Sequence, residues 1–246
     1  MNLTRLSLLL LIALACGGRA LAFDGTAKPE SSARSVYGWF GFDVDNTGPQ
    51  LWLGASKHVA GPLAIASTLW LGLGTGSEPA LGEFAMGPEL NIDDTLTVTL
   101  QLGVGFDFGA RQLQYLSAPQ LFITADLKPI WLEAWNFVYL YGPFHGAYDR
   151  PPGSVPQADT FAGRYALLYE LSPSLAIGPQ LELAVAFKRA AANDLNTLTS
   201  LPLGLRVSLG HGPASTFGLF IGYDTQHAPA TAGTPLVGRL SYIHAF

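Results

Sequence analysis

Apolar residues and small or weakly polar residues alternate along most of this chain. In residues 95–108, large apolar side chains occupy every second position from Leu96 to Phe108, and threonine, glutamine, glycine and aspartate fill the gaps. The same period of two recurs from Leu175 to Phe187 and from Leu201 to Leu209. A period of two is typical of a β-strand with two different faces. The pattern therefore predicts strands longer than the usual five or six residues.

The composition of the second face indicates the surroundings of these strands. A soluble sheet would expose Lys, Glu and Asp to water, whereas here the second face carries mainly Gly, Ala, Ser and Thr. Charged residues make up 13% of the chain, against roughly 25% in a typical soluble domain. Outside the N-terminus no apolar run approaches the ~20 residues of a membrane-spanning helix. We therefore expect an all-β fold, an antiparallel up-and-down transmembrane β-barrel with bulky side chains facing lipid and small ones facing the interior.

Turn signals divide residues 35–246 into about twelve candidate strands, with ten or fourteen as alternatives. Links after the even-numbered strands are short, and the longer links 142–159, 189–196 and 225–235 follow odd-numbered strands. Short turns on one side and long loops on the other are typical of outer-membrane barrels, and an even count places both termini in the periplasm. The expected strands are residues 35–44, 49–59, 63–74, 81–91, 95–108, 115–126, 130–141, 160–171, 175–188, 197–209, 216–224 and 236–246.

The N-terminus has the features of a secretory signal peptide. Arg5 precedes an apolar stretch, and Ala20-Leu21-Ala22 forms a small-x-small cleavage site, so residues 1–22 are expected to be removed. Phe23 then begins the mature chain, and residues 23–34 form a short periplasmic segment. The only cysteine, Cys16, leaves with the signal; residues 13–16 faintly resemble a bacterial lipobox, and lipidation at Cys16 is the alternative.

The C-terminus has alternating apolar residues that end in an aromatic residue. Leu240, Tyr242, His244 and Phe246 share one face of the last expected strand. This pattern resembles the C-terminal signature of bacterial outer-membrane proteins, although His244 departs from it. The resemblance implies a Gram-negative outer membrane, contact with its lipid and lipopolysaccharide, and recognition of Phe246 by the barrel-insertion machinery. As a whole, the chain resembles uncharacterised small outer-membrane barrels. The net charge of −5 argues against a nucleic-acid partner.

Charged and amide side chains collect on the inward parity of several strands. Charges inside a narrow barrel must pair or meet water. They form either a network that rigidifies the barrel or a wall that filters solutes. A repeated Gly/Ala-Pro-Gln/Glu-Leu motif also directs a Gln or Glu inward, at residues 50, 89, 120 and 180. The lumen candidates are Arg164, Arg206, Arg239, Glu170, Glu182, Glu133 and Gln180.

All five tryptophans fall on the same parity as these polar residues, with strand 130–141 depending on whether Glu133 points inward. They either fill the interior, return to the lipid face through a bulge, or form an apolar, sugar-stacking wall opposite the arginines. The aromatic-wall candidates are Trp39, Trp52, Trp70, Trp131 and Trp135. The proline-rich link 142–159 is a lid, a binding surface or a solvated cap. Its contact candidates are Phe144, His145, Tyr148, Asp149 and Arg150.

The sequence contains no metal-ligand spacing, phosphate-binding loop or catalytic constellation, so we expect no metal, no cofactor and no enzyme. The function that the pattern favours is a narrow channel or small-solute uptake protein with a charged and aromatic lumen. Twelve strands lie between the filled eight-stranded barrel and the open sixteen-stranded porin. A filled, non-conducting barrel with a structural or surface-binding role is therefore one alternative, and a lipid-modifying barrel enzyme is another.

Overall fold

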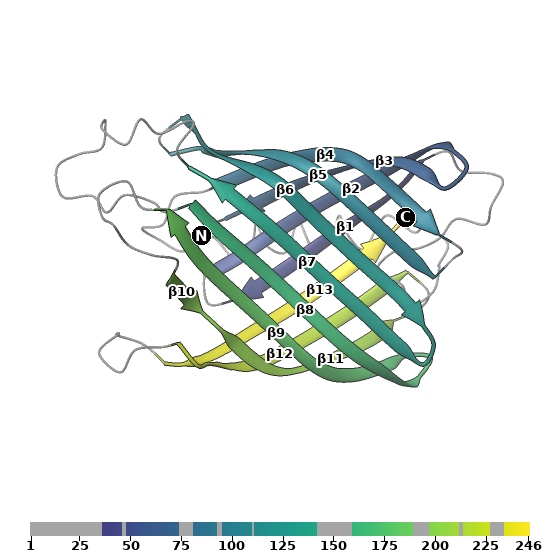
Figure 1. The fold of residues 1–246 in the computed structure, drawn as a ribbon. Helices are drawn as coiled ribbons and strands as arrows, with labels where there is room; N and C mark the ends of the chain where they lie inside the picture. The colour runs from purple at the N-terminus through teal and green to yellow at the C-terminus, as the bar shows by residue number, and fades with distance from the viewer. Residues whose placement is uncertain are drawn as a thin grey trace, which may run out of the picture.

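A computed structural model gives the fold of the protein (Figure 1). All described secondary structure is β-strand, and within the described residues no helix is long and apolar enough to cross a membrane. The structure describes residues 36–45, 48–73, 81–92, 95–109, 111–141, 159–188, 197–211, 214–226 and 234–246.

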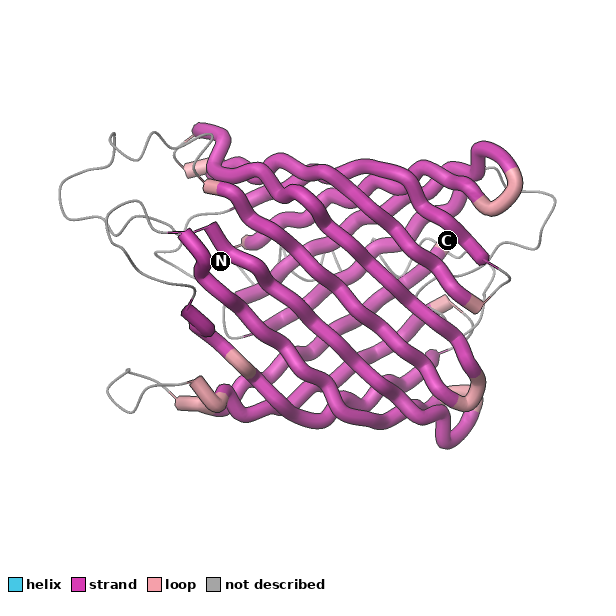
Figure 2. Tube along the Cα trace, viewed as in Figure 1, coloured by secondary structure: helices cyan, strands magenta, loops and turns pink. Residues whose placement is uncertain are grey.

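Thirteen strands run antiparallel to their neighbours around one sheet (Figure 2). Their bounds are β1 Val36–Asp45, β2 Gly48–Ala60, β3 Leu63–Gly72, β4 Leu81–Ile92, β5 Leu96–Asp107, β6 Gln112–Leu127, β7 Ile130–Leu140, β8 Asp159–Ser172, β9 Leu175–Lys188, β10 Thr197–Ser200, β11 Pro202–His211, β12 Ser215–Asp224 and β13 Leu236–Ala245.

The sheet closes on itself. β1 pairs with β13, and β8 pairs with β9, so the ladder continues around the whole wall. Closure supplies backbone hydrogen-bond partners without water, which is the requirement for crossing hydrocarbon. The predicted up-and-down barrel is confirmed.

The expected strand 197–209 is interrupted at Leu201 and becomes β10 and β11, which both pair with β9. Pro202 has no N–H to donate to a ladder. The carboxylate of Asp224 instead accepts hydrogen bonds from Leu201 N at 2.9 Å and Ser200 Oγ at 2.8 Å. The short β10 and the longer β11 occupy one position in the wall, and the barrel has the twelve positions that the sequence predicts.

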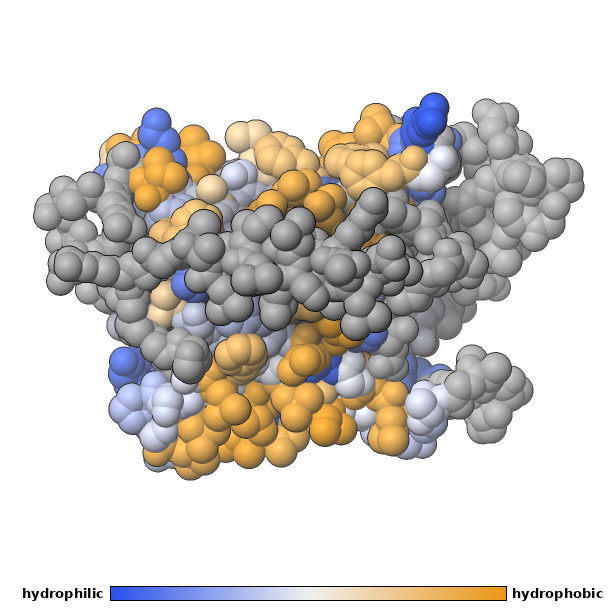
Figure 3. Space-filling view, turned by 180° about the vertical axis from the view of Figure 1, so that it is seen from behind, coloured by the Kyte–Doolittle hydropathy of each residue, from blue (hydrophilic) through white to orange (hydrophobic). Residues whose placement is uncertain are grey.

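The two faces of the wall differ as the alternation predicts. Large apolar side chains lie on the outer surface, where Figure 3 shows broad hydrophobic areas. Leu102 is 62% exposed, and Leu171 and Leu203 are also exposed. Buried inner positions include the small residues Ala64 and Ala176. A bulky apolar exterior around a small-residue interior is the arrangement of a barrel whose solvent is lipid.

The barrel has two different ends. One, here called the short-turn end, carries the two-residue turns 61–62, 128–129 and 173–174, and the opposite end is called the long-loop end. Gly61 has a φ of 54° in the first of these turns, a conformation that favours glycine. Phe246 lies at the short-turn end, where its backbone exchanges hydrogen bonds with Gly38 at 2.8 and 3.0 Å (Figure 1).

The outward orientation of β5 predicts a depth-dependent effect of charge. Leu102→Arg, near the middle of the strand, should lower the free energy of unfolding in lipid vesicles by about 2–4 kcal/mol, because the guanidinium would face hydrocarbon. The matched Leu96→Arg, at the strand's start, should cost at most about 1 kcal/mol. Urea unfolding of both variants in vesicles measures the difference. Equal costs at the two depths would contradict the assigned membrane position.

Candidate functional site

The interior is crossed by ion pairs centred on Arg239 of β13. Its guanidinium lies 3.3 Å from Asp45 and 3.9 Å from Asp43, both on neighbouring β1. It also lies 3.1 Å from Glu182 of β9, which the strands β11 and β12 separate from β13 in the sheet. The side chains of Arg239 and Glu182 are 12% and 16% exposed. The contact therefore spans the lumen and keeps some access to solvent.

Two further arginines complete this set of charges. Arg164 of β8 lies 3.5 Å from Glu182, directly opposite it in the β8–β9 ladder. Arg206 of β11 lies 3.0 Å from Glu133 of β7, across β8 and β9. Both pairs lie on the inner face, where a charge without a partner is costly. The pairs Arg206–Glu133 and Arg239–Glu182 tie together strands that are not neighbours.

Aromatic side chains also meet across the barrel. The rings of Trp52 on β2 and Trp135 on β7 are 5.9 Å apart, although four strands separate them in the sheet. Trp52 also contacts Trp70 at 6.1 Å, and Trp135 contacts Phe122 at 5.6 Å. The guanidinium of Arg164 lies over the Trp135 ring at 4.6 Å, a cation–π contact. The Trp52–Trp135 contact constricts the lumen.

The structure places all five tryptophans on the inner face. Trp131 is buried, Trp39 lines the cavities described below, and the indole N–H of Trp70 donates to Gln50 Oε1 at 3.0 Å. In β7, Glu133 points inward, where it is buried and accepts a hydrogen bond from Arg206. Trp131 and Trp135 lie on the same side of this strand.

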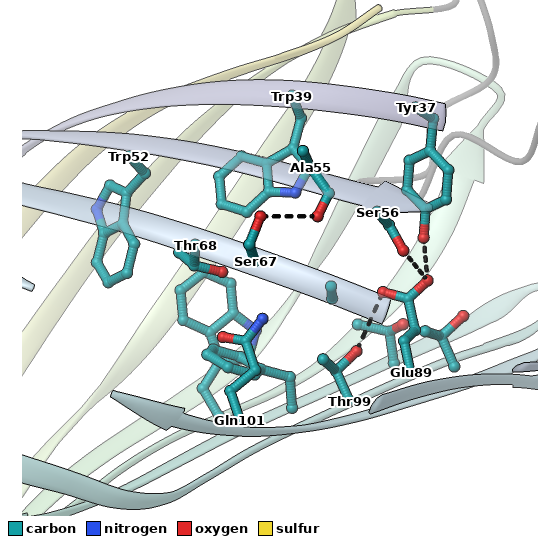
Figure 4. A pocket seen from close by; sticks show the side chains of 15 residues that line it. Tyr37, Trp39, Trp52, Ala55, Ser56, Ser67, Thr68, Glu89, Thr99 and Gln101 are labelled. Atoms are coloured by element: carbon teal, nitrogen blue, oxygen red, sulfur yellow. Dashed lines mark hydrogen bonds between the residues drawn. The ribbon is translucent and has the colours of Figure 1, made fainter. Parts of the chain in front are cut away.

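Two neighbouring cavities lie in the lumen. The larger, of about 110 Å³, is lined by side chains of β1 to β7, including Trp39, Trp52, Glu89 and Gln101 (Figure 4). The smaller, of about 80 Å³, is lined on one side by the Glu133–Arg206 pair. The two cavities share the walls formed by Trp39, Thr124 and Trp135. We call the larger one the Glu89 cavity.

The remaining lumen candidates have different environments. Gln180 is buried, and its amide donates to Glu182 Oε1 at 2.8 Å, so it helps to hold that carboxylate. Glu170 lies on the inward parity of β8 near the short-turn end, and no side-chain hydrogen bond or ion pair joins it to another described residue. The following predicted features lie outside the described residues: the signal peptide with Cys16, the segment 23–34, and the loop candidates Phe144, His145, Tyr148, Asp149 and Arg150.

The inward Gln or Glu of the repeated motif bonds to inner-face residues in each copy. Gln50 donates to Asp45 at 3.0 Å and Gln120 donates to Glu83. Sequence reasoning did not single out Asp43, Asp45 and Glu83 as lumen residues. The signal for the first two was available, because they share the parity of Trp39 in the same strand.

One polar cluster lies on the outer wall at the short-turn end. The hydroxyl of Ser215 lies 2.9 Å from His244 Nδ1 and 3.2 Å from the Tyr242 hydroxyl. The sequence alone did not predict this contact, because 29 residues separate Ser215 from His244. A serine–histidine catalytic pair needs a third group that orients the ring. Here His244 Nε2 is buried and finds no hydrogen-bond partner within the described chain, so the cluster lacks that group.

Among the described residues no group of three His, Cys, Asp or Glu side chains is placed to hold a metal ion. The lumen therefore offers charged pairs, aromatic rings and two cavities as its functional chemistry.

Comparisons with known proteins place this geometry in a structural class. No family model and no curated protein matches the sequence. Among solved structures, the KdgM porin has a TM-score of 0.51 at 9% identity, covering 85% of this chain and 99% of that one. The protein has the fold of an outer-membrane β-barrel. A structure from a study of in-meso crystallization of membrane proteins has a TM-score of 0.58 at 12% identity, covering 85% of this chain and 83% of that one.

The cross-lumen pair Arg206–Glu133 predicts a coupled effect on stability. Glu133→Gln should lower the free energy of unfolding by about 3 kcal/mol, because it leaves a guanidinium on the inner face without its counter-charge. Adding Arg206→Met should recover part of that loss, so the double variant costs less than the sum of the single variants. Urea unfolding of the four proteins measures this coupling.

The control is Glu170→Gln, which removes a carboxylate of the same lumen that has no ion pair with a described residue and should cost less than about 0.5 kcal/mol. Strictly additive costs for Glu133→Gln and Arg206→Met would argue against the cross-lumen bond.

Proposed function

We propose that the protein is a narrow outer-membrane channel for small polar solutes and that it prefers cations. The observation that carries this proposal is an excess of carboxylates in a lumen that keeps partial access to solvent. Asp43, Asp45, Glu133 and Glu182 face three arginines. A narrow path lined by one excess sign of charge raises the local concentration of the opposite ion.

Two further carboxylates add to this excess. Glu83 and Glu89 are 5% and 6% exposed, and their described partners are neutral amides and hydroxyls. Neither forms an ion pair with a basic residue of the described chain. Carboxylates therefore outnumber the three lumen arginines among the described residues.

In the proposed channel, the path of the solute through the lumen is narrowest at the Trp52–Trp135 contact. An opening bounded by indole rings and by the Arg239–Glu182 pair would admit ions and small solutes and hold back larger ones. The side chains at this level lie on strands and not on loops, so the restriction belongs to the wall of the barrel.

A filled, non-conducting barrel is the second candidate function. The contacts that favour it cross the lumen: Arg239–Glu182 at 3.1 Å, Arg206–Glu133 at 3.0 Å and Trp52–Trp135 at 5.9 Å. In that case the network would serve to rigidify the barrel, and the function would lie on the surface.

We also propose the cellular setting of the channel. The protein would be exported through a signal peptide of residues 1–22. It would lie in a Gram-negative outer membrane, in contact with lipid and lipopolysaccharide, and the insertion machinery would recognise Phe246. The closed barrel with a bulky apolar exterior supports this setting. We propose no enzymatic activity for this barrel.

Planar-bilayer recording tests the channel. The wild-type barrel should carry a small, steady current, and a salt gradient should give a reversal potential on the cation side, because carboxylates exceed arginines in the lumen. Trp135→Ala should raise the single-channel conductance at least about twofold, since the indole that crosses the lumen is removed.

The matched control is Phe106→Ala, an aromatic truncation on the outer parity of β5, which should leave the conductance unchanged. Silence of both the wild type and Trp135→Ala over a wide voltage range would exclude the channel and favour the filled barrel. An anion-selective current would contradict the charge argument while leaving a channel in place.

A further inference from the structure

The Glu89 cavity combines a carboxylate with aromatic walls and has no basic side chain of the described residues in its lining. Glu89 Oε1 accepts hydrogen bonds from Tyr37, from Ser56 at 2.9 Å and from Asn91 at 3.1 Å. Among the described residues, Oε2 accepts a hydrogen bond from Thr99 alone, at 3.3 Å (Figure 4). All four partners donate to the carboxyl group, and Oε2 retains a lone pair for another donor.

The neighbouring cavity shows what the Glu89 cavity lacks. Both share Trp39 and Trp135 as walls, and both contain one glutamate. In the smaller cavity Glu133 is paired with Arg206 at 3.0 Å. In the Glu89 cavity no basic side chain of the described chain lines the wall. Arg206 supplies the counter-charge for Glu133 in the smaller cavity. A positively charged ligand would supply the counter-charge for Glu89 in the Glu89 cavity.

A second observation points to a ligand in the same space. Gln101 is 2% exposed and lines the Glu89 cavity, and its carbonyl Oε1 finds no hydrogen-bond partner within the described chain. A buried acceptor without a partner is costly and is uncommon in folded proteins. Figure 4 shows Gln101 and Glu89 on the same side of the cavity, with Trp39 and Trp52 on the other.

The walls suit an organic cation. Rings of Trp39, Trp52 and Trp135 line the cavity together with Tyr37 and Phe122. A cation held against such rings gains from their π-electrons, and indole gives the strongest contact. Trp135 already makes one contact of this kind with Arg164, whose charge is balanced by Glu182. The volume of about 110 Å³ suits a compact head group.

We propose that the Glu89 cavity is a binding site for a small ammonium compound. The cation would lie among the indoles, with the free lone pairs of Glu89 Oε2 and Gln101 Oε1 directed at its positive end. This inference rests on the proposed function only in requiring that the lumen is reached from solution. It adds to the channel a site at which one class of solute is recognised.

Calorimetric titration of the detergent-solubilised barrel tests the site with choline as the probe. We expect saturable binding of choline and none of 3,3-dimethyl-1-butanol, a neutral molecule of the same shape, because the charge provides the attraction. Glucose should not bind, since no positive charge is present. This comparison uses the wild-type protein alone and does not depend on any variant folding.

Glu89→Gln should weaken choline binding at least about tenfold, because it removes the charge and keeps the shape. The matched control is Glu170→Gln, the same change on the inward parity of β8 at a position that does not line the cavity. That variant should bind choline as the wild type does.

Absence of saturable choline binding would overturn the proposal. So would equal binding of the neutral alcohol or of glucose, or equal losses in the two variants. These outcomes are distinct from a failure of the channel. A barrel that conducts but does not bind choline loses the site alone, and one that binds choline but never conducts loses the channel alone.

Discussion

The hydrogen-bonding requirement of a backbone in hydrocarbon governs this structure. Each N–H and C=O that faces lipid must find a partner in the wall, so the sheet closes through β1–β13 and β8–β9. Closure in turn creates an enclosed interior too narrow for bulky side chains from every strand. The outer face carries leucine and phenylalanine, the inner face carries alanine and glycine, and the few large inner residues meet across the lumen.

The large side chains of the interior contact one another. Arginines meet carboxylates of distant strands, and indoles meet other aromatic rings. The pairing is incomplete, because carboxylates exceed basic groups and Glu89 has only neutral partners among the described residues. The carboxylates that exceed the arginines in this interior are the basis of the proposed preference for cations.

The period of two was sufficient to predict the barrel class, a wall of about twelve strands and the orientation of most strand residues. It did not predict the irregularity in β6 between Ser117 and Gln120, which are both buried and lie on opposite parities, and it left the orientation of strand 130–141 open. It gave no information on distance across the lumen. The Trp52–Trp135 and Arg206–Glu133 contacts depend on strand tilt and register, which alternation does not encode. The interruption at Leu201 depends on Asp224 from another strand, and the outer-wall pair Ser215–His244 depends on the register between β12 and β13.

The most direct test of the account is the accessibility of the five tryptophans, which it places inside the wall. The folded protein in vesicles of brominated-chain lipid should keep most of its tryptophan fluorescence, because the indoles are separated from the acyl chains by the sheet. Strong quenching by the brominated chains would show indoles on the lipid face. That result would contradict the inward lumen and every functional statement built on it.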